Sequence, residues 1–333
     1  MGYELVKIGF AKNERVFSAL NRLGFSMKKA QNLCDKGRIL DSSARTLAKN
    51  QLFSGELFMT HYVCYPKGLK PVFETDDFAV FEKPSGICSH PNGRNSPYNM
   101  YDEIWHLYGK GACVAHRLDA ETSGLLLVAK NTKIATELKS LFENRAVFKS
   151  YLAYVRGDFS ADLGRVIERG LLKPFNASML NLAKYCDFKA KSEYLKGFHG
   201  YVIDKAMKLG GLATSLKQKM IISGDGKRAL TLIRVLKNPN DLNQNASLLE
   251  CVPLTGRQHQ IRVHLFHVEH AILGEMLYGL SRAQAESILD KQISVDERIK
   301  LTGANRLMLH ANELKFSYKG EQFNIKSQAK FAL

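Results

Sequence analysis

Short apolar runs separated by polar turns recur along most of the chain. Runs of this kind, bounded by glycine, proline or charged residues, are typical of buried strands, and they occur at residues 78–81, 124–129, 151–155 and 248–253. Ile134, Leu138 and Leu141 recur at helical spacing, which predicts a helix over residues 131–144. Because strands and helices do not alternate regularly, the pattern favours an α+β sheet domain over a doubly wound one.

The first part of the chain has the pattern of a small helical module. Residues 15–23 and 26–36 predict two helices with a break at Gly24, and Ser26 is a candidate N-cap for the second. Gly37 ends that helix, and a short strand is expected directly after it. The second helix carries several lysines, so we interpret the module as a small RNA-binding shape.

These patterns divide the chain into three parts. We expect a small module at residues 1–64, a linker rich in proline and glycine at residues 65–77, and the main domain at residues 78–333. A lysine-rich stretch with weak periodicity, at about residues 175–218, is expected to insert into the main domain as helices or mobile surface. The chain has no internal repeat and no glycine-rich phosphate loop.

The charge of the chain points to a polyanionic partner. The 333 residues carry a formal net charge of +16, and 45% of them are hydrophobic. The chain can therefore bury a substantial core while it presents a basic surface, and nucleic acid is the default partner for that combination. The alternative, that the excess of lysine only solvates the surface, stays open on charge alone.

Composition also indicates the compartment. No apolar run approaches the roughly 18–20 residues that span a bilayer, and the amino terminus lacks a signal-peptide pattern. We therefore expect a soluble, cytoplasmic protein. The six cysteines are scattered without close pairs, so the sequence predicts neither a disulfide framework nor a zinc site.

A dense polar turn precedes one of the predicted strands. Residues 116–123 contain charged and hydroxyl side chains, and the apolar run at residues 124–129 follows directly. A reactive group is often held in this way, at the end of a rigid element, and Asp119 is the natural candidate for a nucleophile or base. On residue types alone, an aspartate beside Thr122 and Ser123 more often only caps a turn.

The same turn carries a resemblance to a known family. Residues 116–130 match the "HRLDxxTSGLLLxAK" signature of the RluA-type pseudouridine synthases, and two further segments resemble its "KxYLAxVxG" and "LxTGRxHQIRxHL" motifs, at residues 149–157 and 254–265. Weaker similarities to "NKPxG", "GKxA" and "RLxLHA" lie at residues 81–86, 226–229 and 306–311. The chain departs from the family at Glu275, where aspartate is common, and in the lysine-rich stretch.

The N-terminal module is similar to the alpha-L RNA-binding domain named after ribosomal protein S four. Residues 36–39 resemble its "KxGRI" turn and residues 54–57 its terminal "xxGE" turn. Asp41-Ser42-Ser43 stands where that domain usually carries "VNG". The alternative is an ordinary helical cap on the main domain.

The family resemblance implies a fold, a reaction and a partner. It implies a mixed, mostly antiparallel sheet with flanking helices as the catalytic domain. The implied activity is the isomerisation of uridine to pseudouridine in structured RNA, with no cofactor or metal. Large-subunit (23S) ribosomal RNA is favoured over transfer RNA as substrate, because the N-terminal module is commoner among ribosomal members, and a monomer is expected.

The resemblance also implies roles for individual residues. Asp119 would be the catalytic carboxylate, Arg262 its ion-pair partner, and Tyr151 the aromatic ring that stacks on the target base. Arg117 would enter the space that the flipped base leaves, and Arg257 would hold a phosphate. In all, the RNA or uridine contacts are expected at Arg117, His116, Arg257, Ile261 and Leu309.

Three other interpretations compete with this one. Four histidines between residues 259 and 270 could form a metal site, although no carboxylate or cysteine motif accompanies them. Asp119 and Glu121 could be a glycosidase pair, although two carboxylates on one turn suit that reaction poorly. The protein could also be a non-catalytic RNA-binding or ribosome-assembly factor that uses its basic surface alone.

Overall fold

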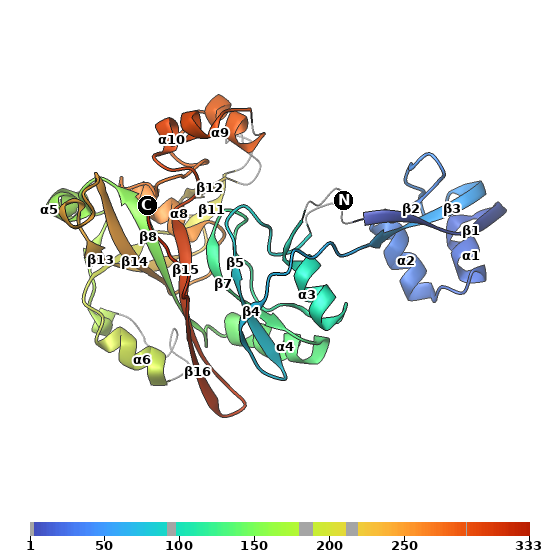
Figure 1. Cartoon of the computed structure of the whole chain (residues 1–333), viewed down its shortest axis with the longest axis horizontal. Coiled ribbons are helices and arrows are strands. Elements are labelled where there is room, and N and C mark those ends of the chain that lie inside the picture. Colours follow the sequence, from blue (N-terminus) through green and yellow to red (C-terminus); the bar gives the residue numbers. More distant parts are fainter. Residues whose placement is uncertain (1–2, 92–97, 180–188, 211–218, 291) are drawn as a thin grey trace. The chain divides into compact units, whose positions relative to one another are not determined.

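The computed structural model describes residues 3–91, 98–179, 189–210, 219–290 and 292–333 (Figure 1). The chain forms two compact units. The N-terminal unit comprises Met1–Gly68 with Pro91–His106, and the main unit comprises Leu69–His90 with Leu107–Leu333.

Between Tyr3 and Tyr62, the N-terminal unit combines two helices with a small sheet. Its elements are β1 (Tyr3–Arg15), α1 (Val16–Arg22), α2 (Met27–Asp35), β2 (Ile39–Leu40) and β3 (Leu52–Tyr62). The strand order is β1-β3-β2, and the apolar faces of both helices pack on one side of the sheet around Leu20, Leu33 and Leu57. Ser26 caps α2 as expected, since its hydroxyl accepts the backbone N–H of Lys29.

The module is less helical than the sequence pattern predicts. The two long strands β1 and β3 pair along most of their length, and neither is evident from alternation of apolar residues. Only one face of this sheet is covered, and the register shifts between Lys7 and Gly9 and again between Ala11 and Glu14. These irregularities break the two-residue period by which a half-buried strand is recognised in sequence.

The expected linker at residues 65–77 is largely built into the structure. Asp102 in α3 (Met100–Tyr108) accepts hydrogen bonds from the Tyr62 hydroxyl and the Tyr65 backbone N–H, both at 3.0 Å. Pro71–Glu74 forms β4, which pairs with β5 (Phe78–Lys83) of the main unit. Tyr65 is therefore hydrogen-bonded within the N-terminal unit, and residues 71–74 belong to the sheet of the main unit.

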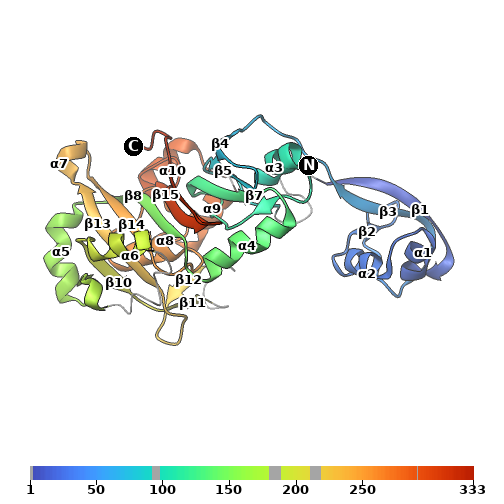
Figure 2. The same cartoon turned by 90° about the horizontal axis from the view of Figure 1, so that it is seen from below.

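One large sheet forms the centre of the main unit (Figures 1 and 2). All its pairs are antiparallel except β7 with β15, which confirms the mixed, mostly antiparallel α+β fold. Its strands, in spatial order after β4 and β5, are β7 (Ser123–Ala129), β15 (Leu309–Tyr318), β8 (Phe148–Arg156), β14 (Ala246–Pro253), β13 (Leu230–Lys237), β10 (Tyr201–Asp204) and β9 (Lys173–Pro174), with β6 (Cys113–Val114) beside β7 and β16 (Glu321–Lys326) beside β15.

Helices and short hairpins surround this sheet. The buried helix α8 lies against β13 and β14, and α4 lies against β6 and β7. The other elements of the main unit lie at its edges and ends, and Figure 1 shows α9 and α10 together beyond the ends of the strands. Their bounds are α4 (Thr132–Glu143), α5 (Phe159–Glu168), η1 (Ala177–Met179), α6 (Lys189–Lys196), β11 (Met207–Leu209), β12 (Met220–Ile222), α7 (Pro239–Leu242), α8 (Gln260–His267), α9 (Arg282–Leu289) and α10 (Val295–Thr302).

The lysine-rich stretch at residues 175–218 is only partly an insertion. It contains the expected helix α6, but β10 within it pairs with β13 and extends the central sheet. Residues 180–188 and 211–218 of this stretch lie outside the described residues. The short strand was missed because four residues are too few to show a period against a lysine-rich background.

Gly124 marks a close contact between two central strands. It has a φ of +108°, and a Cβ there would lie 2.3 Å from the carbonyl oxygen of Ala311 on β15. We expect Gly124→Ala to lower the free energy of unfolding by more than about 2 kcal/mol, because both the backbone conformation and the contact oppose a side chain.

Gly164 provides the control, because it lies within α5 and a Cβ there meets no atom within 4 Å. Gly164→Ala should raise stability by about 0.5–1 kcal/mol. Urea titration of both variants measures the difference, and equal destabilisation by the two would contradict the assignment.

Candidate active site

Asp119 lies on a loop that the surrounding chain holds by several backbone hydrogen bonds. The loop connects β6 to β7, and the Asp119 side chain is 30% exposed. Ser89 Oγ donates to the carbonyl of Leu118 at 2.8 Å, and Ser85 Oγ donates to that of Glu121 at 2.6 Å. Asp119 is therefore accessible from solvent but attached to a rigid frame, as the polar turn before the strand predicts.

Lys83 is the central support of this loop. Its fully buried ammonium donates to the carbonyls of Pro84 (2.9 Å), Ile87 (2.8 Å) and Ala120 (2.9 Å). Burial lowers the pKa of Lys83 to about 8, and nearby acidic groups oppose that shift. Lys83 belongs to the segment that resembles "NKPxG", at residues 81–86. It thus holds the backbone of Ala120, the residue next to Asp119.

Replacement of Lys83 by methionine should destabilise the main unit. Methionine fills much of the same space but leaves the carbonyls of Pro84 and Ile87 without their donor, while that of Ala120 keeps the backbone N–H of Gly86. We therefore expect a loss of about 3 kcal/mol of unfolding free energy. The exposed Lys133 on α4 is the control, and Lys133→Met should stay within about 0.5 kcal/mol of the wild type. Chemical denaturation tests both, and a wild-type value for Lys83→Met would remove Lys83 from this role.

Arg262 connects Asp119 to a buried acidic residue. Its Nη1 lies 3.4 Å from Asp119 Oδ2, while Nε and Nη2 donate to the two carboxylate oxygens of Glu275 at 2.7 and 2.6 Å. Burial disfavours the charge on Arg262, but the facing carboxylates outweigh burial and raise its pKa. In the same way, burial opposes the charge on Glu275, but Arg262 outweighs it and lowers the pKa of that carboxyl.

His259 approaches the same carboxylate oxygen of Asp119, and Tyr278 contacts both His259 and Arg262. His259 Nε2 is 3.8 Å from Asp119 Oδ2, and His259 Nδ1 is 2.9 Å from the Tyr278 hydroxyl. The Tyr278 ring also lies beneath the guanidinium of Arg262, 5.5 Å from its centre. Arg262 and His259 both belong to the first turn of α8 and its N-cap, so one helix end directs two donors toward Asp119.

Tyr151 is the aromatic residue near Asp119. It lies on β8, opposite Cys251 of β14 and Ala311 of β15. Burial raises the pKa of its hydroxyl, and the charge of Asp119 adds to the effect. Ile261 and Leu309, the two apolar residues expected at the site, are buried in the core cluster against which Tyr151 packs.

The three remaining candidates, Arg117, Arg257 and His116, differ in the contacts that their side chains make with the other described residues. Arg117 is exposed, and it has no ion pair or hydrogen bond among the described residues. Arg257 is half-buried, and its Nε donates to the carbonyl of Arg228 at 3.2 Å. His116 accepts the backbone N–H of Leu127 at 3.1 Å and stacks on Phe142, so its ring is engaged in holding the loop. Burial first, and then the charge of Lys149, lower the pKa of His116 to about 3.

The geometry of the site bears on the two alternative chemistries, a glycosidase pair of carboxylates and a metal site. Glu121 forms an ion pair with Arg298 at 3.2 Å, and it is therefore not a free partner carboxylate for Asp119. Among the described residues, no group of three histidine, cysteine or acidic side chains is placed to hold a metal ion. Two of the four histidines between residues 259 and 270 have other partners. His264 contacts Thr231 and the backbone carbonyl of Lys205, and His270 contacts the backbone carbonyl of Arg156.

Sequence reasoning missed Glu275, His259 and Tyr278 as site residues. Glu275 and Tyr278 belong to a turn, Gly274–Gly279, which we call the support turn. The only sequence signal was the "GDxxYG"-like spacing of an acidic residue and a tyrosine between two glycines. That pattern alone does not reveal that Glu275 binds Arg262, 13 residues earlier in the chain.

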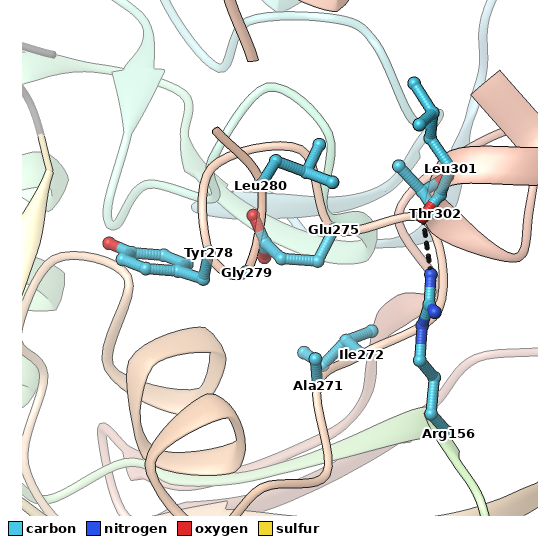
Figure 3. A pocket seen from close by; sticks show the side chains of 9 residues that line it. All are labelled: Arg156, Ala271, Ile272, Glu275, Tyr278, Gly279, Leu280, Leu301 and Thr302. Atoms are coloured by element: carbon cyan, nitrogen blue, oxygen red, sulfur yellow. Dashed lines mark hydrogen bonds between the residues drawn. The ribbon is translucent and has the colours of Figure 1, made fainter. Parts of the chain in front are cut away.

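A pocket of about 170 Å³ lies behind the support turn (Figure 3). Glu275 and Tyr278 line it, and so does Arg156, whose Nη2 donates to the carbonyl of Leu301 at 2.7 Å. Asp119 and Tyr151 do not line it. It is therefore separate from the face of Asp119 on which a substrate would react.

The described residues contain no helix long and apolar enough to cross a membrane. The solved structure of human RNA Pseudouridylate Synthase Domain Containing 1 superposes with a TM-score of 0.53 at 22% identity, over 81% of this chain and 86% of that one, and this likeness supports the fold.

Proteins with similar sequences are named RNA pseudouridine synthases as well. An uncharacterized RNA pseudouridine synthase of Helicobacter pylori strain J99 is 34% identical over 94% of this chain and 90% of its own length. The dual-specificity RNA pseudouridine synthase RluA of Vibrio cholerae is 29% identical over 74% of this chain and 76% of its own length. The RNA pseudouridylate synthase family profile matches residues 77–267. The chain therefore belongs to the RNA pseudouridylate synthase family, in its RluA-type branch, and is an RNA isomerase.

Proposed function

We propose that this pseudouridine synthase uses Asp119 as its catalytic carboxylate and acts on uridines of large-subunit ribosomal RNA. The observation that supports the catalytic role is the partly exposed Asp119 carboxylate, 3.4 Å from a buried Arg262 that Glu275 holds in place. A carboxylate acts as a nucleophile or base in its charged form, and a guanidinium at this distance is a favourable partner for that charge. The other acidic residues of the site are already paired with arginines.

The reaction exchanges one bond to the sugar for another. The bond between C1′ of the ribose and N1 of uracil breaks, the base rotates, and a bond from C1′ to C5 forms. N1 gains a proton and C5 loses one, so the reaction needs no redox partner and no water. Asp119 either attacks C1′ or accepts a proton on the way to a glycal; both routes begin with the ionised carboxylate.

The target base must leave the helical stack before it can react, at a cost of a few kcal/mol. Arg117 is suited to fill the gap, because its guanidinium is exposed, planar and without a partner among the described residues. The Tyr151 ring beside Asp119 is suited to stack on the extruded base. Arg257 remains our proposal for a phosphate contact, and Ile261 and Leu309 for the apolar wall behind Tyr151.

The choice of ribosomal RNA rests on the relatives and on the N-terminal unit. The ribosomal large subunit pseudouridine synthase C of Buchnera aphidicola is 28% identical over 76% of this chain. A yeast tRNA pseudouridine(31) synthase is 32% identical over 63% of it, so transfer RNA is the second candidate. Pseudouridine mapping of total RNA from a strain without the gene decides between them: loss in ribosomal RNA supports the proposal, and loss in transfer RNA alone contradicts it.

We further propose that the N-terminal unit binds RNA through α2, as an alpha-L-like domain would. Lys28 and Lys29 are exposed on the first turn of α2, which contains no acidic residue. Neither lysine forms an ion pair among the described residues, although Lys29 Nζ lies 5.1 Å from the centre of the Phe25 ring, so no carboxylate competes with phosphates for them. The protein is expected to act as a cytoplasmic monomer.

Reversal of both charges, in Lys28→Glu with Lys29→Glu, should weaken binding of the substrate RNA about tenfold or more and reduce its salt dependence. Lys173 and Lys237, exposed on the main unit, provide a double charge reversal of equal size as the control. Affinity at several salt concentrations is the measurement. If the control pair weakens binding as much as the α2 pair, the contribution of α2 is only general charge.

A further inference from the structure

Two buried side chains beside Asp119 have no role in the reaction outlined above. Tyr278 is 3% exposed and His259 is 9% exposed. The Tyr278 hydroxyl oxygen accepts the backbone N–H of Met220 at 3.2 Å and lies 2.9 Å from His259 Nδ1. A hydroxyl has one hydrogen and accepts through its lone pairs, so these contacts constrain where each proton sits.

The contacts of Tyr278 select one tautomer of His259. With Met220 as its donor, the buried hydroxyl must place its own hydrogen on an acceptor, and His259 Nδ1 is the acceptor that the described residues offer. A neutral imidazole that accepts at Nδ1 carries its hydrogen at Nε2. Burial first, and then Arg262, lower the pKa of His259, while Asp119 and Glu275 oppose them, so the surroundings favour the neutral ring.

The Nε2–H of that tautomer is directed at Asp119. Nε2 lies 3.8 Å from Oδ2, the same oxygen that Arg262 Nη1 approaches at 3.4 Å. Both distances are long for hydrogen bonds, and such bonds at active sites often tighten only when the substrate is bound. Because both donors approach Oδ2, the other oxygen, Oδ1, is left to react.

The backbone of His259 supports a positioning role. It adopts the left-handed conformation, with φ 53° and ψ 20°, at the N-cap of α8, where its side chain makes no capping hydrogen bond. A residue with a side chain is strained in this region, and such strain persists where the surroundings fix the conformation. Here it directs the imidazole toward Asp119 and away from the helix end.

We propose that His259 is a second hydrogen-bond donor to the Asp119 carboxylate, and that Tyr278 is a positioning residue that fixes its Nε2–H tautomer. The inference rests on the proposed catalytic role of Asp119. The support turn then has two functions, since Glu275 orients Arg262 and Tyr278 orients His259. Together the two donors hold Oδ2, so that Oδ1 faces the extruded nucleoside.

Single-turnover rates with substrate RNA test the proposal. We expect His259→Ala to lower the rate about 100-fold, the scale on which loss of one preorganised active-site donor acts, and Tyr278→Phe to lower it about tenfold. His259→Gln keeps an N–H donor at the position of Nε2 and should recover most of the loss. RNA affinity should stay within about twofold in all three, since the change is in the carboxylate rather than in RNA contacts.

Tyr318→Phe is the matched control, because it removes a tyrosine hydroxyl that donates to Glu137 at 2.8 Å elsewhere in the main unit. Its rate should equal that of the wild type. If thermal unfolding shows that Tyr278→Phe has lost its fold, the rescue by His259→Gln over His259→Ala still decides the donor role.

The tautomer can also be observed directly. In ¹⁵N-histidine-labelled protein, the resonance that disappears in His259→Gln should report a hydrogen on Nε2 in the wild type and a mixture of tautomers in Tyr278→Phe. An Nδ1–H signal in the wild type, or equal rates for His259→Ala and wild type, overturns the inference. If either result is obtained while Asp119→Asn remains inactive, the proposed role of His259 fails and the proposed role of Asp119 stands. The failures of the two proposals are therefore distinguishable.

Discussion

Replacement of Asp119 by asparagine is expected to lower the single-turnover rate of pseudouridine formation by about 10⁴-fold or more, as loss of a reacting nucleophile or base does in other enzymes. The substitution keeps the shape of the side chain but removes the charge that reacts. The fold should survive, because Arg262 keeps its bidentate ion pair with Glu275. Stability and RNA affinity should therefore remain close to wild type.

The neighbouring Glu121→Gln is the matched control for this experiment. Glu121 lies two residues away on the same loop and is paired with Arg298, not with Arg262. Its loss should change the rate by no more than about threefold, since a partly exposed ion pair contributes little. If Glu121→Gln abolishes activity while Asp119→Asn retains it, the catalytic carboxylate has been assigned to the wrong residue.

Loss of the Glu275 carboxylate is expected to have the largest effect on stability. Glu275→Gln leaves the guanidinium of Arg262, which is 3% exposed, without a bidentate anionic partner. Removing one member of a buried ion pair typically costs about 3–5 kcal/mol, and we expect a loss of that size in the free energy of unfolding. The rate should fall as well, because Arg262 no longer has a fixed direction toward Asp119.

The pH dependence gives this prediction a second readout. Arg262 lowers the pKa of Glu275 in the folded state, so the pair contributes stability above the ordinary glutamate pKa of 4.5, and that contribution is lost as the pH falls through the folded-state value. The difference between wild type and Glu275→Gln should therefore be largest near neutral pH and shrink below about pH 4.5.

Glu275→Asp serves as the control for the Glu275 variant, because it keeps the charge with a shorter reach. It should fall between wild type and Glu275→Gln in both stability and rate. Urea titrations at several pH values measure these differences, and a difference that does not depend on pH would show that the carboxylate is not stabilised by Arg262.

Much of the candidate site could be predicted from sequence because it lies in contiguous segments. The turn at residues 116–123 contains Asp119 and the start of β7, and a buried strand after a polar turn is visible without a structure. The pairing of Asp119 with Arg262 came only from the family resemblance. These residues are 143 positions apart, and no local pattern connects them.

The contacts that support Asp119 and its neighbours were less predictable, because they too join residues that no local pattern connects. Lys83 stands before a proline in a short motif, but its bonds to the carbonyl of Ala120 depend on the packing of β5 beside β7. Tyr278 and His259 meet through a turn and a helix end, and the left-handed backbone of His259 has no sequence signal of the kind that glycine provides.

Most of the fold that the sequence pattern did not predict consists of strands in which apolar and polar residues do not alternate regularly. β1 and β3 pair with register shifts and expose one face, and β4 lies in a segment whose prolines and glycine resemble a linker. Their pairing partners, rather than their own residues, determine that they are strands. Elements with a strong period of their own, such as α4, were predicted within about one residue at each end.

The most direct test is pseudouridine mapping in cells that carry only Asp119→Asn. The strain without the gene identifies the uridines that this protein modifies, and the wild-type gene should restore every one of them. We predict that Asp119→Asn, produced at the same level and binding the same RNA, restores none. Pseudouridine at those positions in the Asp119→Asn strain would contradict the account, because it would mean that another group performs the reaction.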